Sequence, residues 1–247
     1  MMLEPMTCRL LTPFVLSLLM LCTSATAKVY LVSAGIADYP GTSSDLTLPA
    51  KDAETIVGVY RKNTSLEYCL LLNEQATKER IVKAMKRVYM KATANDIVVF
   101  FYSGHGYAGG FCAYDGNLSY GELRKAMAGS KCRYKMIFAD ACFSGDMRTG
   151  GRSSQSALGA VKKASVMLFL SSRSNETSAE RRTMENGFFT TYLQKGLRGG
   201  ADKNRDRVIT AREIYKYVHE GVVELSNGRQ HPVMWGKFSN NMPVMKW

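Results

Sequence analysis

The run Asp96-Ile97-Val98-Val99-Phe100-Phe101-Tyr102 is apolar after its first residue and stops at Ser103-Gly104-His105-Gly106. An apolar run of this length, rich in β-branched and aromatic residues, predicts a strand that is buried on both faces. The segment 134–139 (YKMIFA) repeats the pattern and stops at Asp140-Ala141-Cys142. Each of these two strands is therefore followed directly by a chemically reactive side chain.

Further apolar runs alternate with amphipathic segments along the chain. We expect strands at 29–36, 67–72 and 165–171, and helices at 49–61, 77–92, 119–127, 187–197 and 210–225. Thr77 is a candidate N-cap, and Ser119 with Glu122 forms a capping box. Alternating buried strands and helices predict an α/β fold of three layers (αβα) around a mostly parallel sheet. A chain of 247 residues with 46% hydrophobic residues fits one such domain.

The first 27 residues have the features of a signal peptide. Arg9 precedes an almost wholly apolar run, 10–22, which is followed by Ala25-Thr26-Ala27. The run is too short to span a bilayer, which takes about 20 residues. We expect cleavage after Ala27, a mature domain over 28–247, and a secreted or periplasmic protein with no stable membrane insertion. Lipidation at Cys22 is the alternative, which Leu21 disfavours because lipoprotein signals have a small residue there.

The formal net charge is +12, which could attract nucleic acid or anionic glycans. No run of five like charges and no nucleic-acid motif is present, so we favour a solvated basic surface and expect no nucleic-acid partner. Four cysteines follow the signal, at positions 69, 112, 132 and 142, and their spacing fits no zinc motif. An oxidising compartment would permit one bridge, such as Cys112–Cys132, which the sequence does not establish. A free cysteine in a secreted protein calls for a reason such as catalysis.

His105 and Cys142 are the candidate catalytic pair. Parallel strands end at the same edge of a sheet and lie about 4.8 Å apart, so side chains at neighbouring strand ends can converge. An imidazole can take the thiol proton, and the resulting thiolate is the nucleophile. The N–H groups of Gly106 and Cys142 are natural donors to an oxyanion, since Gly106 has no side chain to obstruct a close approach.

The segments 102–106 (YSGHG) and 140–145 (DACFSG) resemble the paired signatures of the caspase and metacaspase superfamily. The similarity extends from residue 29 to about 236. It implies a caspase-like fold with a large-subunit-like half (28–147), a loop (148–164) and a small-subunit-like half (165–247). It also implies peptide-bond hydrolysis by a dyad of His105 and Cys142, with Gly106 at the oxyanion position and no required cofactor. Phe143 stands where metacaspases often have a histidine that is not the base.

The resemblance extends to substrate preference. Asp52, Ser103 and Asp140 match positions that line the pocket for a basic P1 residue in metacaspases, which implies cleavage after Arg or Lys. Asp52 has another explanation as an exposed first-turn acid that favours the helix dipole, and Asp140 could simply orient the loop behind the nucleophile. Arg173 favours the alternative of an acidic P1 residue.

The segment 202–213 has oxygen side chains at several EF-hand positions, including Asp202, Asn204, Asp206 and Glu213. Arg207 stands where the sharp turn needs glycine, and Thr210 with Glu213 forms a capping box. We therefore favour a structural role over calcium binding. Basic residues in the loop between the halves offer a self-cleavage hypothesis: Arg148, Arg152, Lys162 and Lys163.

The sequence thus predicts a secreted cysteine endopeptidase that acts through a thioester intermediate on protein or peptide substrates. Caspases pair through a sheet edge, whereas metacaspases tend to stay monomeric, so the resemblance leaves the oligomeric state open, with a monomer as one expectation. The alternatives are an inactive binding or scaffold protein on the same fold, and a basic protein that binds nucleic acid or glycan.

Overall fold

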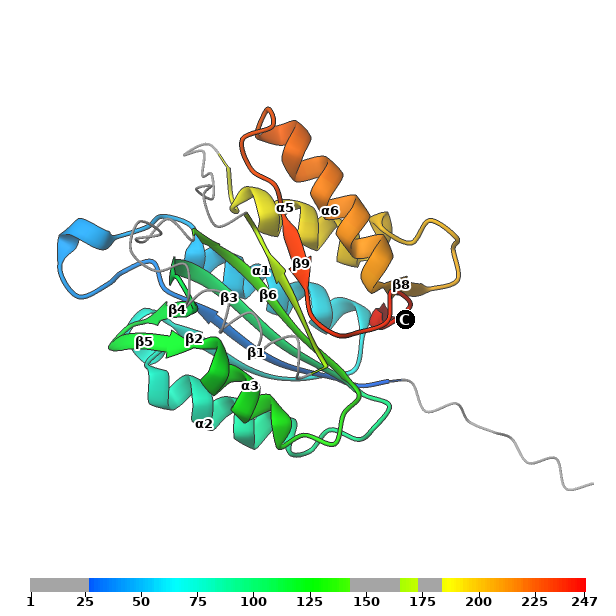
Figure 1. Cartoon of the computed structure of the whole chain (residues 1–247), viewed down its shortest axis with the longest axis horizontal. Helices are drawn as coiled ribbons and strands as arrows, with labels where there is room; N and C mark the ends of the chain where they lie inside the picture. Colours follow the sequence, from blue (N-terminus) through cyan, green and yellow to red (C-terminus); the bar gives the residue numbers. More distant parts are fainter. Residues whose placement is uncertain (1–26, 143–164, 173–183) are drawn as a thin grey trace, which may run out of the picture.

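The computed structural model describes residues 27–142, 165–172 and 184–247, which form three layers around a central sheet (Figure 1). The main strands run in the order β2-β1-β3-β6-β7-β9. The first five are parallel, and β9 pairs antiparallel with β7. Their bounds are β1 Val29–Gly35, β2 Leu66–Leu72, β3 Ile97–Tyr107, β6 Tyr134–Cys142, β7 Val166–Leu170 and β9 Val233–Trp235. The predicted αβα fold with a mostly parallel sheet is confirmed.

Helices cover both faces of this sheet (Figure 1). One face packs against α1 (Pro49–Asn63), α5 (Phe188–Lys195) and α6 (Ala211–Leu225). The other face packs against α2 (Lys78–Tyr89) and α3 (Tyr120–Ala128).

Strand β3 shows why the apolar run is continuous. Val98, Phe100 and Tyr102 belong to the core under α2 and α3. Ile97, Val99 and Phe101 belong to the core under α1, α5 and α6, and all six side chains are fully buried. Because successive strand side chains point to opposite faces, a strand that is covered on both sides needs apolar residues at every position.

The helix starts agree with the capping signals in the sequence. Thr77 accepts a hydrogen bond from the N–H of Arg80, and Ser119 with Glu122 forms a complete capping box before α3. Thr210 and Glu213 form the same box before α6. A cap of this kind is worth about 1 kcal/mol, enough to fix where each helix begins.

Two strands run further than the sequence indicated. Strand β3 continues through His105 to Tyr107, and β6 continues to Cys142, because the two strands stay paired up to the partners His105 and Cys142. The prediction that both reactive residues lie just beyond their strands was therefore wrong: both are the last paired residues of the β3–β6 ladder.

Two small features were not predicted. A hairpin of β4 (Gly110–Ala113) and β5 (Gly116–Ser119) folds back on β3. Asp115-Gly116 is the turn signal that could have found it. A separate two-stranded sheet joins β8 (Val208–Thr210) to β10 (Pro243–Lys246) near the C-terminus (Figure 1).

The suggested Cys112–Cys132 bridge is not formed. Both thiols are free, because the two residues lie at opposite ends of β3. The carbonyl of Cys112 accepts from the Tyr102 hydroxyl, whereas the thiol of Cys132 donates to the carbonyl of Asp96.

In the described ranges, no helix is both long and apolar enough to cross a bilayer.

Candidate active site

His105 and Cys142 are register partners at the carboxyl ends of the parallel strands β3 and β6. The ladder runs without interruption from Ile97 opposite Tyr134 to this last pair. Adjacent strands are about 4.8 Å apart, so the sheet brings together two residues that lie far apart in the chain. The main chains of the two residues lie side by side in the sheet, which is what convergence of their side chains would require.

The main chain before Cys142 is fixed by the end of the next strand. The hydroxyl of Ser171 accepts from the N–H of Ala141 and donates to its carbonyl, at 3.1 and 3.0 Å. Gln230 in turn donates to the Ser171 carbonyl at 2.8 Å. Ser171 and Gln230 are fully buried and were not identified from the sequence.

The ring of His105 is oriented by a carbonyl oxygen. Its Nε2 lies 2.7 Å from the carbonyl of Ser44, at the end of the 3₁₀ turn Thr42–Ser44. A carbonyl can only accept, so Nε2 carries the proton and Nδ1 is left as the acceptor nitrogen. The ring of Tyr39 lies alongside, with ring centroids 4.9 Å apart. In the neutral ring, this contact leaves Nδ1 as the nitrogen that can accept a proton.

Two tyrosine hydroxyls hold the main chain of His105. Tyr39 accepts from the N–H of His105 at 2.9 Å, and Tyr102 lies 2.8 Å from the His105 carbonyl. The hydroxyls lie 3.0 Å apart, and Tyr102 also reaches the carbonyl of Cys112 at 2.7 Å. Burial raises the pKa of Tyr39 to about 12, against opposing hydrogen bonds from Tyr102 and His105, so Tyr39 stays neutral at physiological pH.

Gly104 is required by this hydroxyl pair. Its φ is +150°, and a Cβ there would lie 2.6 Å from the hydroxyls of both Tyr39 and Tyr102. Any side chain would push the two tyrosines off the histidine main chain. Gly106, the candidate oxyanion donor, is half-buried and pairs with Phe111 of β4.

The three candidate pocket residues lie together near the same carboxyl ends of the parallel strands. Asp52 of α1 and Asp140 of β6 are both buried, and Ser103 of β3 is the register partner of Asp140. The Ser103 hydroxyl donates to Asp52 Oδ2 at 2.8 Å. Asn186 and the N–H of Gly187 donate to Asp52 Oδ1 at 2.8 and 3.1 Å.

The start of α5 brings the two carboxylates close together. Both the N–H and the hydroxyl of Thr190 donate to Asp140 Oδ2 at 3.0 Å. A Cβ on Gly187 would lie 2.4 Å from Asp140 Oδ2 and 3.4 Å from Asp52 Oδ2. No pattern in the sequence indicated that Asn186, Gly187 and Thr190 would assemble this acidic pair across the two halves of the chain.

The pKa of Asp52 is raised well above its usual value. Burial is the main cause, and the neighbouring carboxylate of Asp140 adds to it. Hydrogen bonds from Asn186, Ser103 and Gly187 oppose the shift and do not cancel it. In the part of the chain that is described, Asp52 has hydrogen-bond donors and no ion-pair partner. A cation placed here would favour the ionised carboxylate.

In the candidate calcium loop, the carboxylates accept hydrogen bonds from main-chain N–H groups of the same loop. Asp202 accepts from the N–H groups of Asp206 and Arg207, and Asp206 accepts from that of Val208. The carboxylate of Glu213 caps the start of α6 through Thr210. Among the described residues, no group of three or more His, Cys, Asp or Glu side chains is arranged to hold a metal ion.

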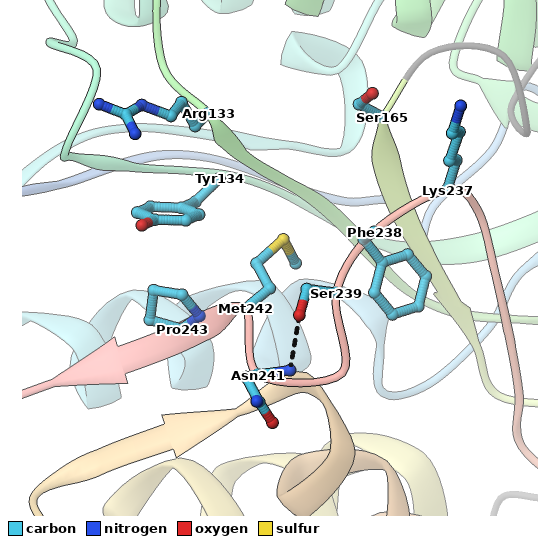
Figure 2. Close-up of a pocket in the computed structure, with 9 residues that line it drawn as sticks. All are labelled: Arg133, Tyr134, Ser165, Lys237, Phe238, Ser239, Asn241, Met242 and Pro243. Carbon is cyan, nitrogen blue, oxygen red and sulfur yellow. Dashed lines mark hydrogen bonds between the residues drawn. The ribbon is translucent and has the colours of Figure 1, made fainter.

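A pocket of about 320 Å³ lies at the amino ends of β6 and β7, opposite to the end that carries His105 and Cys142 (Figure 2). Its walls include Tyr134, the first residue of β6, and Ser165, which precedes β7. Strand β6 has nine residues, so this pocket lies roughly 25 Å from Cys142. It is a separate feature from the candidate catalytic pair.

Several predicted residues lie outside the described ranges. They are the metacaspase-histidine position Phe143, the self-cleavage candidates Arg148, Arg152, Lys162 and Lys163, and the acid-selecting candidate Arg173.

Paired strand ends that carry histidine and cysteine, on a parallel sheet between two helical layers, define a caspase-like α/β protein. The chain belongs to the caspase domain family, which matches residues 32–242.

Two crystal structures share this fold. One is a protein from Geobacter sulfurreducens, 17% identical, with a TM-score of 0.67 over 89% of this chain and 97% of the other. The second is caspase-1 from Spodoptera frugiperda, 16% identical, with a TM-score of 0.60 over 87% of each chain. No curated protein sequence matches the chain.

Proposed function

We propose that the protein is a cysteine endopeptidase that cleaves after Arg or Lys, with Cys142 as nucleophile and His105 as base. The observation that carries the proposal is the pairing of these two residues at the ends of β3 and β6. The contact between His105 Nε2 and the Ser44 carbonyl supports it, because it leaves Nδ1 able to take a proton. Protein or peptide chains are the substrates.

The proposed reaction has two halves. His105 removes the thiol proton of Cys142, and the thiolate attacks the scissile carbonyl carbon. The N–H groups of Gly106 and Cys142 stabilise the oxyanion. The C–N bond then breaks as the amine takes the proton from His105, leaving a thioester. Water, deprotonated by His105, hydrolyses the thioester and restores the thiol. The chemistry uses only the chain's own groups and water, so we propose no cofactor.

The acidic pair supports the basic specificity. A guanidinium or ammonium group beside Asp52 and Asp140 would make charge-assisted hydrogen bonds. It would also relieve the repulsion that raises the Asp52 pKa. An acidic P1 residue would bring a third negative charge to the same place.

The test is fluorophore release from short peptides ending in Arg, Lys or Asp, with wild type, Cys142→Ala and His105→Ala side by side. Cys69→Ala is the matched control, since Cys69 is a half-buried thiol in β2. We expect release after Arg and Lys, lost in both dyad variants and kept in Cys69→Ala. Release after Asp alone would reject the pocket and keep the dyad.

No release from any peptide, with calcium present and after limited proteolysis, would reject the peptidase in favour of an inactive scaffold. Alkylation gives an independent reading, because an activated Cys142 should react faster than Cys69, Cys112 or Cys132. We further propose that residues 1–27 are a signal peptide that directs the protein out of the cytoplasm, and that the enzyme works as a monomer.

A further inference from the structure

Strand β1 starts immediately after the expected signal-cleavage site. The carbonyl of Lys28 accepts from the N–H of Ile97, and the N–H of Val29 donates to the carbonyl of Ser65, both at 2.9 Å. Val29 is the first residue that pairs with both neighbouring strands, at the amino ends of β2 and β3, and Lys28 directly precedes it. The peptide bond to be cut, between Ala27 and Lys28, lies just before the amino end of β1, an inner strand of the sheet.

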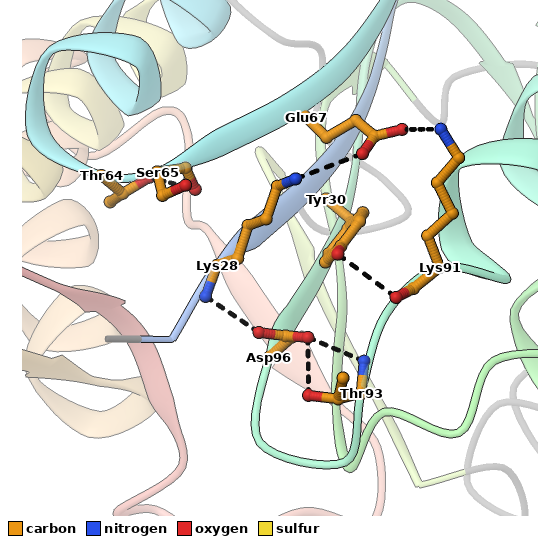
Figure 3. Close-up of polar contacts among 8 residues, drawn as sticks. All are labelled: Lys28, Tyr30, Thr64, Ser65, Glu67, Lys91, Thr93 and Asp96. Atoms are coloured by element: carbon orange, nitrogen blue, oxygen red, sulfur yellow. Dashed lines mark hydrogen bonds and ion pairs between the residues drawn. The ribbon is translucent and has the colours of Figure 1, made fainter. Parts of the chain in front are cut away.

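A buried carboxylate faces the nitrogen of that bond (Figure 3). Asp96 is only 8% exposed, and its Oδ1 accepts from the main-chain nitrogen of Lys28 at 2.9 Å. The N–H and hydroxyl of Thr93 both donate to its Oδ2 at 2.7 Å. Within the ranges that the structure describes, no Lys or Arg side chain lies within ion-pair distance of Asp96. The carboxylate is therefore a buried anion that is hydrogen-bonded but lacks a contacting cation.

We propose that Asp96 is a receptor for the α-ammonium group of Lys28, which forms when the Ala27–Lys28 bond is hydrolysed. Water adds across the bond: Ala27 leaves with the leader as a carboxylate, and the nitrogen of Lys28 becomes an ammonium group. The amide N–H···carboxylate contact then becomes an ion pair without movement of either residue. Removal of the leader thereby stabilises the fold. This inference rests on the proposed cleavage site and not on the proposed peptidase activity.

The geometry selects one new terminus. A chain that began one residue earlier would hold its charge a full residue away from Asp96, with an uncharged amide still at the carboxylate. A chain that began at Val29 would lose the Lys28 carbonyl that pairs with Ile97. Only a start at Lys28 places a positive charge 2.9 Å from Oδ1.

The groups around the new terminus set its pH response. The Lys28 side chain pairs with Glu67 at 3.3 Å, and Glu67 also pairs with Lys91. The ring of Tyr30 in β1 lies under the side-chain ammonium group of Lys28. The Cys132 thiol donates to the main-chain carbonyl of Asp96. Burial raises the pKa of Asp96, but hydrogen bonds from Thr93 and Lys28 outweigh it and hold the pKa below its usual value. Asp96 is therefore ionised at neutral pH and ready to pair.

The sign of the pH effect follows from the pairing. An α-ammonium group has a pKa of about 7.7 to 8.0 in an unfolded chain, and a carboxylate partner raises it in the folded state. The extra stability is therefore complete below about pH 7.5 and is lost as the pH rises through the higher folded value.

The test compares two forms of the Cys142→Ala protein, which prevents self-cleavage. One begins at Lys28, and the other keeps Ala25-Thr26-Ala27 in front. We expect the Lys28 form to melt about 2 to 4 °C higher at pH 6.5, with the gap closing above about pH 9. Asp96→Asn should abolish the gap. Glu67→Gln is the matched control, because it removes the partner of the Lys28 side chain and should leave the gap intact.

If Asp96→Asn does not fold, the pH dependence of the gap between the two forms decides. Equal melting temperatures at pH 6.5, a gap that persists at pH 10, or a gap that survives Asp96→Asn would overturn the proposal. The intact mass of the protein exported with its own leader tests the site: a start at Lys28 supports the proposal, and any other start, including lipidated Cys22, overturns it. None of these readouts uses peptidase activity.

Discussion

The N–H of His105 donates to the phenolic oxygen of Tyr39 at 2.9 Å, although 66 positions separate the two residues. Tyr102 contacts the carbonyl of the same histidine, so both polar groups of this residue's main chain are held by hydroxyls. The ring is held from another direction by the Ser44 carbonyl. The proposed base is thus positioned by contacts to its main chain and to its ring.

Tyr39→Phe should slow the proposed reaction only because His105 is no longer held in position. Loss of the hydroxyl leaves the His105 N–H without its acceptor, which costs about 1 to 3 kcal/mol, and frees the main chain to shift. We expect kcat to fall about 10-fold or more while KM stays near the wild-type value, since Tyr39 contacts no proposed pocket residue. An unchanged kcat would contradict the positioning role.

Tyr60→Phe is the matched control and a prediction in its own right. Tyr60 of α1 is fully buried against the sheet, and its hydroxyl has no hydrogen-bond partner among the described residues. Removing an unsatisfied buried hydroxyl should raise the melting temperature by about 2 to 4 °C and leave activity unchanged. Thermal unfolding checks this, and a loss of stability would indicate an undetected partner.

Asp52→Asn should raise the stability of the fold and lower the proposed activity. The amide keeps an acceptor for Asn186 and Gly187 and removes the charge that repels Asp140. Because the folded-state pKa of Asp52 is raised, its ionisation destabilises the fold above the unfolded pKa of about 4. The gain in melting temperature should therefore be larger at pH 8 than at pH 4.

The same variant should cleave Arg peptides about 10- to 100-fold more slowly, which corresponds to one charge-assisted hydrogen bond. The values of kcat/KM for Arg and Lys peptides measure this loss. Full activity in Asp52→Asn would leave Asp52 with a structural role only, as a buried acceptor that ties α1 to the start of α5.

Gly187→Ala should disrupt the acidic pair without touching the dyad. Its φ is −54°, so the substitution causes no backbone strain, but the new Cβ would lie 2.4 Å from Asp140 Oδ2. Either the carboxylate or α5 must shift. We expect the rate on Arg peptides to fall at least 10-fold while alkylation of Cys142 stays fast. A matching loss of alkylation would place the damage at the nucleophile instead.

Much of the fold could be read from local pattern. The apolar runs at 97–102 and 134–139 predicted buried parallel strands, and the caps at Thr77, Ser119 and Thr210 predicted where helices begin. The ends of β3 and β6 were missed because pairing continues through residues whose side chains are polar or absent. Strand extent at such positions depends on the neighbouring strand and not on local composition.

The sequence by itself determined the order of the main strands and helices, the burial of the sheet on both faces and the two strand ends that carry His105 and Cys142. These depend on periodicity and caps, which act over a few residues. Only the tertiary structure decided what surrounds those strand ends. Ser44 at the imidazole, Asn186 on Asp52 and Asp96 at the nitrogen of Lys28 are joined across 61, 134 and 68 positions. Such contacts form only after packing brings distant segments together, and a polar residue has no local signal that names its partner.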